Sequence, residues 1–135
     1  MRYFLLLITL SLYLFAMTPF EKSLEDFYSD NQTKQEASIL YFKLAAKEGN
    51  KDAAFILGYY YKSDTFNHKD LKSSCFWYEL SAKHGERSAM FITGWNYYKG
   101  IGCEQNRKLA LYWFNEASKL GDIQAIEILD YLETS

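Results

Sequence analysis

The chain has 135 residues, of which 49% are apolar, 24% are charged and 19% are aromatic, and its formal net charge is −2. This length suffices for one domain with a hydrophobic core, and the charge gives no sign of the basic surface that nucleic-acid-binding proteins carry. A single proline favours long helices over a loop-rich β fold, and two cysteines are too few for a disulfide framework or a structural zinc site.

The N-terminal segment combines a basic residue, Arg2, with an apolar run over residues 3–17. A basic start followed by an apolar stretch of this length is typical of a secretory signal. A membrane-spanning helix needs about 20 apolar residues, and Pro19 and the charged residues after it end the run earlier. We therefore predict that residues 1–18 are a signal peptide, with an uncleaved membrane anchor or a buried helix as the alternatives.

Residues 19–35 are mostly polar, but Leu24, Phe27 and Tyr28 are spaced along one side of a helix. Because terminal repeats of an array are usually atypical, we interpret this segment as a short, degenerate helix and linker that caps the open end of the fold.

A period of 36 residues dominates the rest of the chain, from residue 36 to residue 135. Residues 45–62 and 81–98 align without a gap and share eight identities. The recurring small and aromatic positions are Gly49, Ala53, Gly58, Trp77, Gly85, Ala89, Gly94, Trp113 and Gly121. A fixed period of this length indicates a solenoid of stacked helical pairs.

Two helices alternate within each period. The apolar spacing predicts helices near 36–47, 51–62, 71–83, 87–98, 107–120 and 122–133. Gly49 provides a left-handed stop for the first of these, and Asp70 and Asn106 are favourable N-caps.

Gly58 and Gly94 lie inside predicted helices, where each costs up to about 1 kcal/mol relative to alanine. This cost is expected if another helix passes close to the backbone there. Asp130 takes the same place in the last helix, so no further helix is expected to pack on it.

The second full copy carries a specific pattern of small and aromatic residues. Its members are Ala89, Gly94, Tyr97, Gly100, Gly102, Asn106, Ala110, Trp113, Phe114, Ala117 and Gly121. This pattern resembles that of the Sel1-like repeats, which are tetratricopeptide-related α/α repeats, and the resemblance covers roughly residues 36–133. In the copy before it, Asp64 and Phe66 replace the two loop glycines and Ser74 replaces the alanine, which suggests a reshaped loop.

The resemblance implies an all-α fold, a right-handed α/α solenoid of about three 36-residue helical pairs behind the N-terminal signal or anchor segment. It also implies an adaptor that holds other proteins, frequently in the bacterial envelope or among secreted proteins.

Aromatic residues recur on the side of the second helices that faces away from the small-residue stripe. They are Phe55 and Tyr59 in one helix and Phe91, Trp95 and Tyr98 in the next. For Phe55 and Phe91, burial by neighbouring helices is the expected state, and exposure on this side is the alternative. Exposed Tyr and Trp usually mark interfaces. We predict that a protein or peptide partner binds at Tyr59, Trp95, Asn96 and Tyr98.

Cys75 begins one predicted helix and Cys103 lies in the next long loop, so both are expected at the same end of the stack. Two buried thiols are the expected state, and a disulfide between them is the alternative in an oxidising compartment. Some members of the resembled family carry disulfides that clip each helical pair, with cysteines much closer in sequence than these two.

No hydrolase, zinc-protease or phosphate-loop motif occurs in the sequence. We expect no catalytic residue, metal or cofactor, and no nucleic-acid partner. We predict a secreted or periplasmic module that binds protein or peptide, and a membrane contact only if the N-terminal segment is uncleaved. The alternatives are a cell-wall or β-lactam hydrolase, as the resemblance to cysteine-rich repeat proteins implies, and a membrane-anchored structural subunit.

Overall fold

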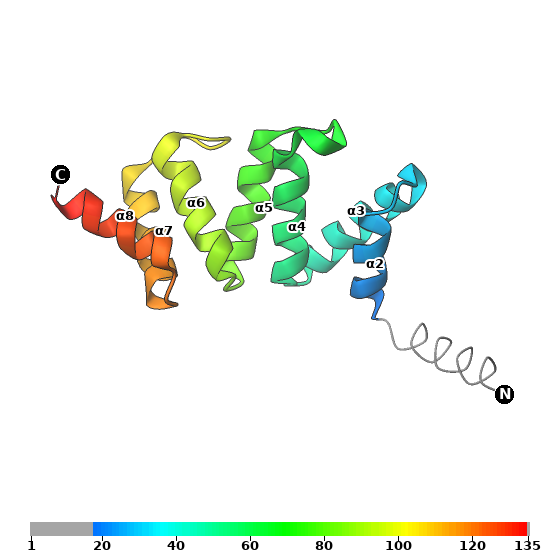
Figure 1. The fold of residues 1–135 in the computed structure, drawn as a ribbon, viewed down its shortest axis with the longest axis horizontal. Coiled ribbons are helices and arrows are strands. Elements are labelled where there is room, and N and C mark those ends of the chain that lie inside the picture. Colours follow the sequence, from blue (N-terminus) through cyan, green and yellow to red (C-terminus); the bar gives the residue numbers. More distant parts are fainter. Residues whose placement is uncertain (1–17, 135) are drawn as a thin grey trace, which may run out of the picture. The chain divides into compact units, whose positions relative to one another are not determined.

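The computed structural model describes residues 18–134. These residues form seven α-helices and one short 3₁₀ helix, and none of them lies in a β-strand. The elements are α2 (Pro19–Phe27), α3 (Gln32–Lys47), α4 (Lys51–Lys62), η1 (Asp64–Phe66), α5 (Leu71–Lys83), α6 (Arg87–Lys99), α7 (Arg107–Lys119) and α8 (Ile123–Thr134) (Figure 1). The predicted all-α class is confirmed. Within the described residues, no helix has both the length and the apolar character of a membrane span.

The predicted signal peptide or anchor lies outside the described residues, apart from Thr18, and stays a prediction. Thr18 caps α2: its hydroxyl accepts from the Glu21 N–H, and the Glu21 carboxylate accepts from the Thr18 N–H. The short helix predicted after the N-terminal segment is therefore present as α2.

The chain forms two compact units, and the boundary after Phe42 falls inside α3. In the first unit, the rings of Phe20 and Phe27 lie 5.7 and 5.9 Å from the ring of Phe42 in edge-to-face contacts. α3 begins four residues before the predicted start, because the Asn31 side chain accepts from the Lys34 N–H at its first turn.

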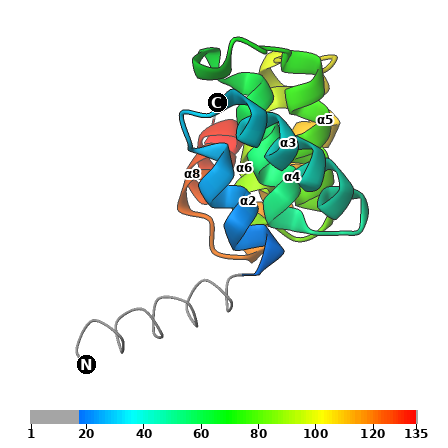
Figure 2. The ribbon, with the colours of Figure 1, turned by 90° about the vertical axis from the view of Figure 1, so that its right-hand side faces the viewer.

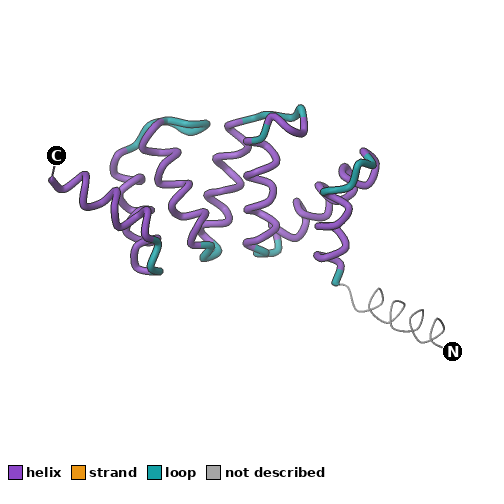
Figure 3. The backbone as a smooth tube through the Cα atoms, in the orientation of Figure 1, coloured by secondary structure: helices purple, strands orange, loops and turns teal. Residues whose placement is uncertain are grey.

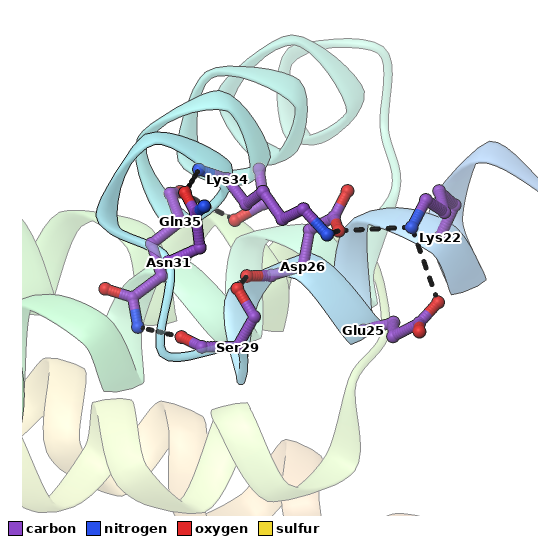
Figure 4. A network of polar contacts seen from close by, with 8 residues as sticks. Lys22, Glu25, Asp26, Ser29, Asn31, Lys34 and Gln35 are labelled. Carbon is purple, nitrogen blue, oxygen red and sulfur yellow. Dashed lines mark hydrogen bonds and ion pairs between the residues drawn. The ribbon is translucent and has the colours of Figure 1, made fainter.

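Polar contacts also join α2 to α3 within the first unit (Figure 4). Asp26 lies 3.2 Å from the Lys22 ammonium on its own helix and 3.7 Å from Lys34 on the next. The Gln35 amide donates to the Ser29 carbonyl at 2.6 Å. Because these groups are exposed or only partly buried, they orient the two helices more than they stabilise them.

The second unit begins at Lys43 and contains α4 to α8. Within this unit, α5 packs on α4 and α6, and α7 packs on α6 and α8. Figure 3 shows the two long loops, after α4 and after α6, at one end of these helices and the tight turns at the other. Seen along the array in Figure 2, α6 lies behind α4, and α5 lies beside them. Contacts between sequence neighbours alone are the signature of a solenoid.

Glycine permits the closest contacts between helices. A Cβ added at Gly58 would lie 2.7 Å from the Tyr78 ring, and one added at Gly94 would lie 2.7 Å from the Phe114 ring. The close approach predicted from the repeated glycines is therefore present. Ser74, which replaces the alanine of the repeat, uses this closeness to donate to the Gly58 carbonyl at 2.8 Å.

The other repeated positions fill the core or end helices. Ala53 and Ala89 are fully buried, and Trp77 and Trp113 are 8% and 6% exposed. Gly49, Gly85 and Gly121 follow helices with φ of 97°, 88° and 77°, a left-handed conformation that favours glycine. The predicted N-caps Asp70 and Asn106 are confirmed by bonds from the first-turn N–H groups of α5 and α7.

Candidate partner-binding surface

Three aromatic side chains occupy one position of the repeat. Tyr59, Trp95 and Tyr131 lie at successive 36-residue intervals, on α4, α6 and α8. Tyr59 is 43% exposed, Tyr131 is 61% exposed, and Trp95 is partly exposed. We call these three residues the aromatic row. Tyr131 was missed in the sequence analysis, although the same interval that relates Tyr59 to Trp95 points to it.

Trp95 is the centre of a larger group of rings on α6. Its ring lies 6.4 Å from Phe91 in a nearly parallel arrangement and 5.8 Å from Tyr98. The ring of Phe114 on α7 is fully buried and also belongs to this group. Its centre lies 5.7 Å from that of Phe91 and 6.5 Å from that of Tyr98. The Lys99 ammonium lies 5.2 Å from the Trp95 ring centre and 5.0 Å from that of Tyr98. The rings therefore contact one another and the Lys99 ammonium, and these contacts favour one arrangement of the group.

The loop after α4 extends the surface around Tyr59. Phe66 of η1 lies 6.3 Å from the Tyr59 ring and 5.2 Å from that of Tyr60, and His68 lies 5.7 Å from Tyr60. The predicted reshaping of this loop thus brings an aromatic side chain to the first residue of the aromatic row. The glycine loop after α6 contributes no such ring.

One predicted binding residue, Asn96, lies deeper than a docking surface requires, and Phe55 and Phe91 are covered as expected. Asn96 is 4% exposed, so its side chain is not presented to a partner, and we leave it out of the surface. Phe55 and Phe91 are partly buried and pack against the hydrophobic core, with Phe55 at 5.3 Å from Tyr78. At 100° per residue, Asn96 lies about 100° from Trp95, on the side of α6 that carries the buried Ala89 and Thr93, so its burial follows from helix geometry.

A pocket of about 460 Å³ adjoins the ring group at the end of α6. It is lined by Tyr98 and Lys99 of α6, Gln105 of the following loop and Arg107 of α7. The Gln105 amide donates to the Tyr98 carbonyl at 2.9 Å, which ties the loop to the helix end. No carboxylate lines the pocket.

Two tyrosines next to this surface have pKa values raised to about 12. For Tyr78 the cause is burial, with a smaller effect of Tyr59. For Tyr97 the causes are burial and the hydrogen bond that its hydroxyl donates to the Glu79 carboxylate at 3.0 Å. Both phenols are therefore neutral at physiological pH, and Tyr97 joins α6 to α5. Among residues 18–134, no group of His, Cys, Asp and Glu side chains is placed to hold a metal ion.

Cys75 and Cys103 form a disulfide, with their Cα atoms 6.1 Å apart. The expectation of two buried thiols is therefore wrong, and the alternative, a disulfide between them, is present. The reason is a non-local contact: Gly102 lies against the Leu71 carbonyl, where any side chain would overlap the backbone. This contact brings the loop after α6 onto the first turn of α5 and places Cys103 opposite Cys75.

Comparison with known proteins places the repeats in a family. A family model described as Sel1 repeat matches residues 31–50, 51–86 and 87–122. A solved Sel1 repeat protein from Oxalobacter formigenes is 31% identical, with a TM-score of 0.72, over 82% of this chain and 84% of that chain. No curated protein matches the sequence.

Two further solved structures share the fold. Cysteine-rich protein B of Helicobacter pylori is 24% identical, with a TM-score of 0.64, over 70% of this chain and 71% of that chain. A protective antigen of uropathogenic Escherichia coli that displays an SLR fold is 22% identical, with a TM-score of 0.72, over 84% of this chain and 24% of that chain.

Proposed function

Because this chain belongs to the Sel1 repeat family, whose members are typically protein–protein interaction modules, we propose that it binds a protein or peptide partner on the aromatic row. The observation that carries the proposal is the presence of Tyr59, Trp95 and Tyr131 at one surface position of three successive repeats. The glycines, alanines and buried tryptophans form the contacts between the repeats, whereas these three rings keep part of their surface exposed. Exposed aromatic rings that recur at one position often mark an interaction site.

The physical chemistry of these side chains suits recognition. Tyr and Trp provide a large contact area with few rotatable bonds, and they are the residues most often found at the energetic centre of interfaces. The contacts of Trp95 with Phe91, Tyr98 and Lys99 fix its ring before a partner arrives. Little conformational entropy is then lost on binding.

We also propose that the protein acts outside the cytoplasm, in a secreted or periplasmic location. The support is the Cys75–Cys103 disulfide, because such bonds persist in oxidising compartments and are rare in the cytosol. Sel1 repeat proteins are generally scaffolds without catalytic activity, and the cysteine-rich relative shares the fold alone. The hydrolase alternative therefore has no supporting observation.

Site-specific photo-crosslinking in the native host tests the binding surface. A photoreactive phenylalanine analogue replaces Tyr59, Trp95 or Tyr131, one at a time, and in control variants it replaces Phe76 or Tyr112. The controls are more exposed than Tyr59 and Trp95, at 58% and 53%, but lie on α5 and α7. We expect adducts of one discrete mass from the aromatic row and none from the controls.

A Trp95→Ala variant tests how much the Trp95 side chain contributes to the binding free energy. Truncating an aromatic anchor at the centre of an interface costs at least about 2 kcal/mol, or roughly 30-fold in Kd. We therefore expect crosslinking from position 59 to fall strongly in Trp95→Ala while the helical circular dichroism stays unchanged. Adducts from Phe76 and Tyr112 alone, or equal adducts from all five positions, would show that the aromatic row is not the binding surface.

A further inference from the structure

The pocket at the end of α6 is continuous with the aromatic row through one side chain. Lys99 lines the pocket, and its ammonium also lies over the rings of Trp95 and Tyr98. A partner that covers Trp95 would therefore also approach Lys99, a lining residue of the pocket. Its volume of about 460 Å³ lies within the range of sites that hold small ligand groups.

The pocket holds two positive charges without an internal counter-charge. Within the described residues, neither Lys99 nor Arg107 lies within ion-pair distance of a carboxylate. Elsewhere in the second unit, Lys51, Lys83 and Lys119 each pair with a glutamate. The two unpaired cations meet at the same pocket from different elements, the end of α6 and the start of α7.

The remaining lining groups favour an anionic ligand with acceptor oxygens. The phenol of Tyr98 can donate a hydrogen bond, and the amide of Gln105 has a second N–H besides the one bonded to the Tyr98 carbonyl. The planar guanidinium of Arg107 matches a carboxylate through two parallel hydrogen bonds. No lining residue would repel a negative charge.

We propose that this pocket binds a Glu or Asp side chain of the partner, so that the surface selects an acidic peptide segment with an apolar residue beside the acid. The inference rests on the proposed function, because the same partner would cover Trp95 while its carboxylate enters the pocket. A peptide carboxylate is favoured over a free anion because the pocket opens beside rings that a peptide side chain can cover.

Nuclear magnetic resonance titration with two capped peptides tests the proposal. The probes are acetyl-Ala-Leu-Glu-Glu-Phe-Ala-amide and its analogue with Gln at both acidic positions, so that side chains supply the only carboxylates. We expect the acidic peptide to shift the amide signals of Tyr98, Gln105 and Arg107 saturably and to bind about tenfold more tightly than the neutral analogue. This preference should shrink as salt is raised, because the pocket is open to solvent.

The matched variants are Arg107→Gln and Lys108→Gln. Both remove one exposed cation from the first turn of α7, but only Arg107 lines the pocket. We expect Arg107→Gln to weaken binding of the acidic peptide at least about fivefold and to leave the affinity for the neutral analogue unchanged. Lys108→Gln should change neither affinity. Unchanged helical circular dichroism of both variants would show that folding is not the cause.

Three results would overturn the pocket proposal. They are equal affinity for both peptides, equal losses in the two variants, and tighter binding of inorganic phosphate than of the acidic peptide. Failure here is distinguishable from failure of the proposed function. If Arg107→Gln still crosslinks from Tyr59 and Tyr131 as the unmodified chain does, the binding surface stands without the acidic preference.

Discussion

Glycine marks the points where the helices of this protein approach each other most closely. A Cβ added at Gly94 would lie 2.7 Å from the ring of Phe114 and 3.2 Å from the Ala110 carbonyl oxygen. In a typical exposed helix, alanine is favoured over glycine by up to about 1 kcal/mol. At position 94, packing instead favours glycine over alanine, because an added methyl group would force a buried ring and a backbone carbonyl to move.

Replacing Gly94 by alanine should therefore destabilise the protein. Overpacking costs about 1–3 kcal/mol, and the gain in helix propensity offsets up to about 1 kcal/mol of it. We expect a net loss of about 1–2 kcal/mol in the free energy of unfolding, measured with urea. Asp130→Ala is the control, because Asp130 has the same place in the repeat but is exposed. A Gly94→Ala variant as stable as the unmodified chain would show that the Phe114 ring can shift without cost.

At the scale of residues, most roles could be predicted from the repeat and from helix geometry. The repeated glycines pointed to close packing because a costly residue recurred at one position. The burial of Asn96 was also predictable, because at 100° per residue Asn96 lies on the same side of α6 as the buried Ala89 and Thr93, so its assignment to the binding surface was wrong. Tyr131 was likewise predictable, because it lies one 36-residue period after Trp95.

At the scale of elements, helix positions were predictable and loop contacts were not. The observed bounds of α4 to α8 agree with the prediction within one residue, since apolar spacing and capping residues act locally. The Cys75–Cys103 bond depends instead on the fit of Gly102 against Leu71, which are far apart in sequence. That contact ties the loop after α6 to the start of α5.

This disulfide should contribute strongly to stability. It closes a segment with a sequence separation of 28 residues, for which the loss of unfolded-state entropy corresponds to about 3–4 kcal/mol. We expect the Cys75→Ser/Cys103→Ser variant to lose a free energy of unfolding of this order. The unmodified chain with a reductant should fall to the same value, while the double variant should not respond to the reductant. Equal stability of the oxidised and reduced chain would contradict a stabilising bond.

At the scale of the whole molecule, the fold followed from the period and the location depends on two separate features. The N-terminal apolar run predicts export, and the disulfide is typical of an oxidising compartment, but neither feature implies the other. Their agreement supports the proposed location outside the cytoplasm. The family alone does not specify a compartment.

The intact mass of the protein from its native host tests both features at once. Export predicts the loss of about 16 to 18 N-terminal residues, since secretory signals are removed in the mature protein. The disulfide predicts that neither Cys75 nor Cys103 is alkylated until a reductant is added. An uncut chain that is released only by detergent would instead identify a membrane-anchored subunit. A full-length, water-extractable chain with two reactive thiols would contradict export, and the search for the partner would then move to the cytoplasm.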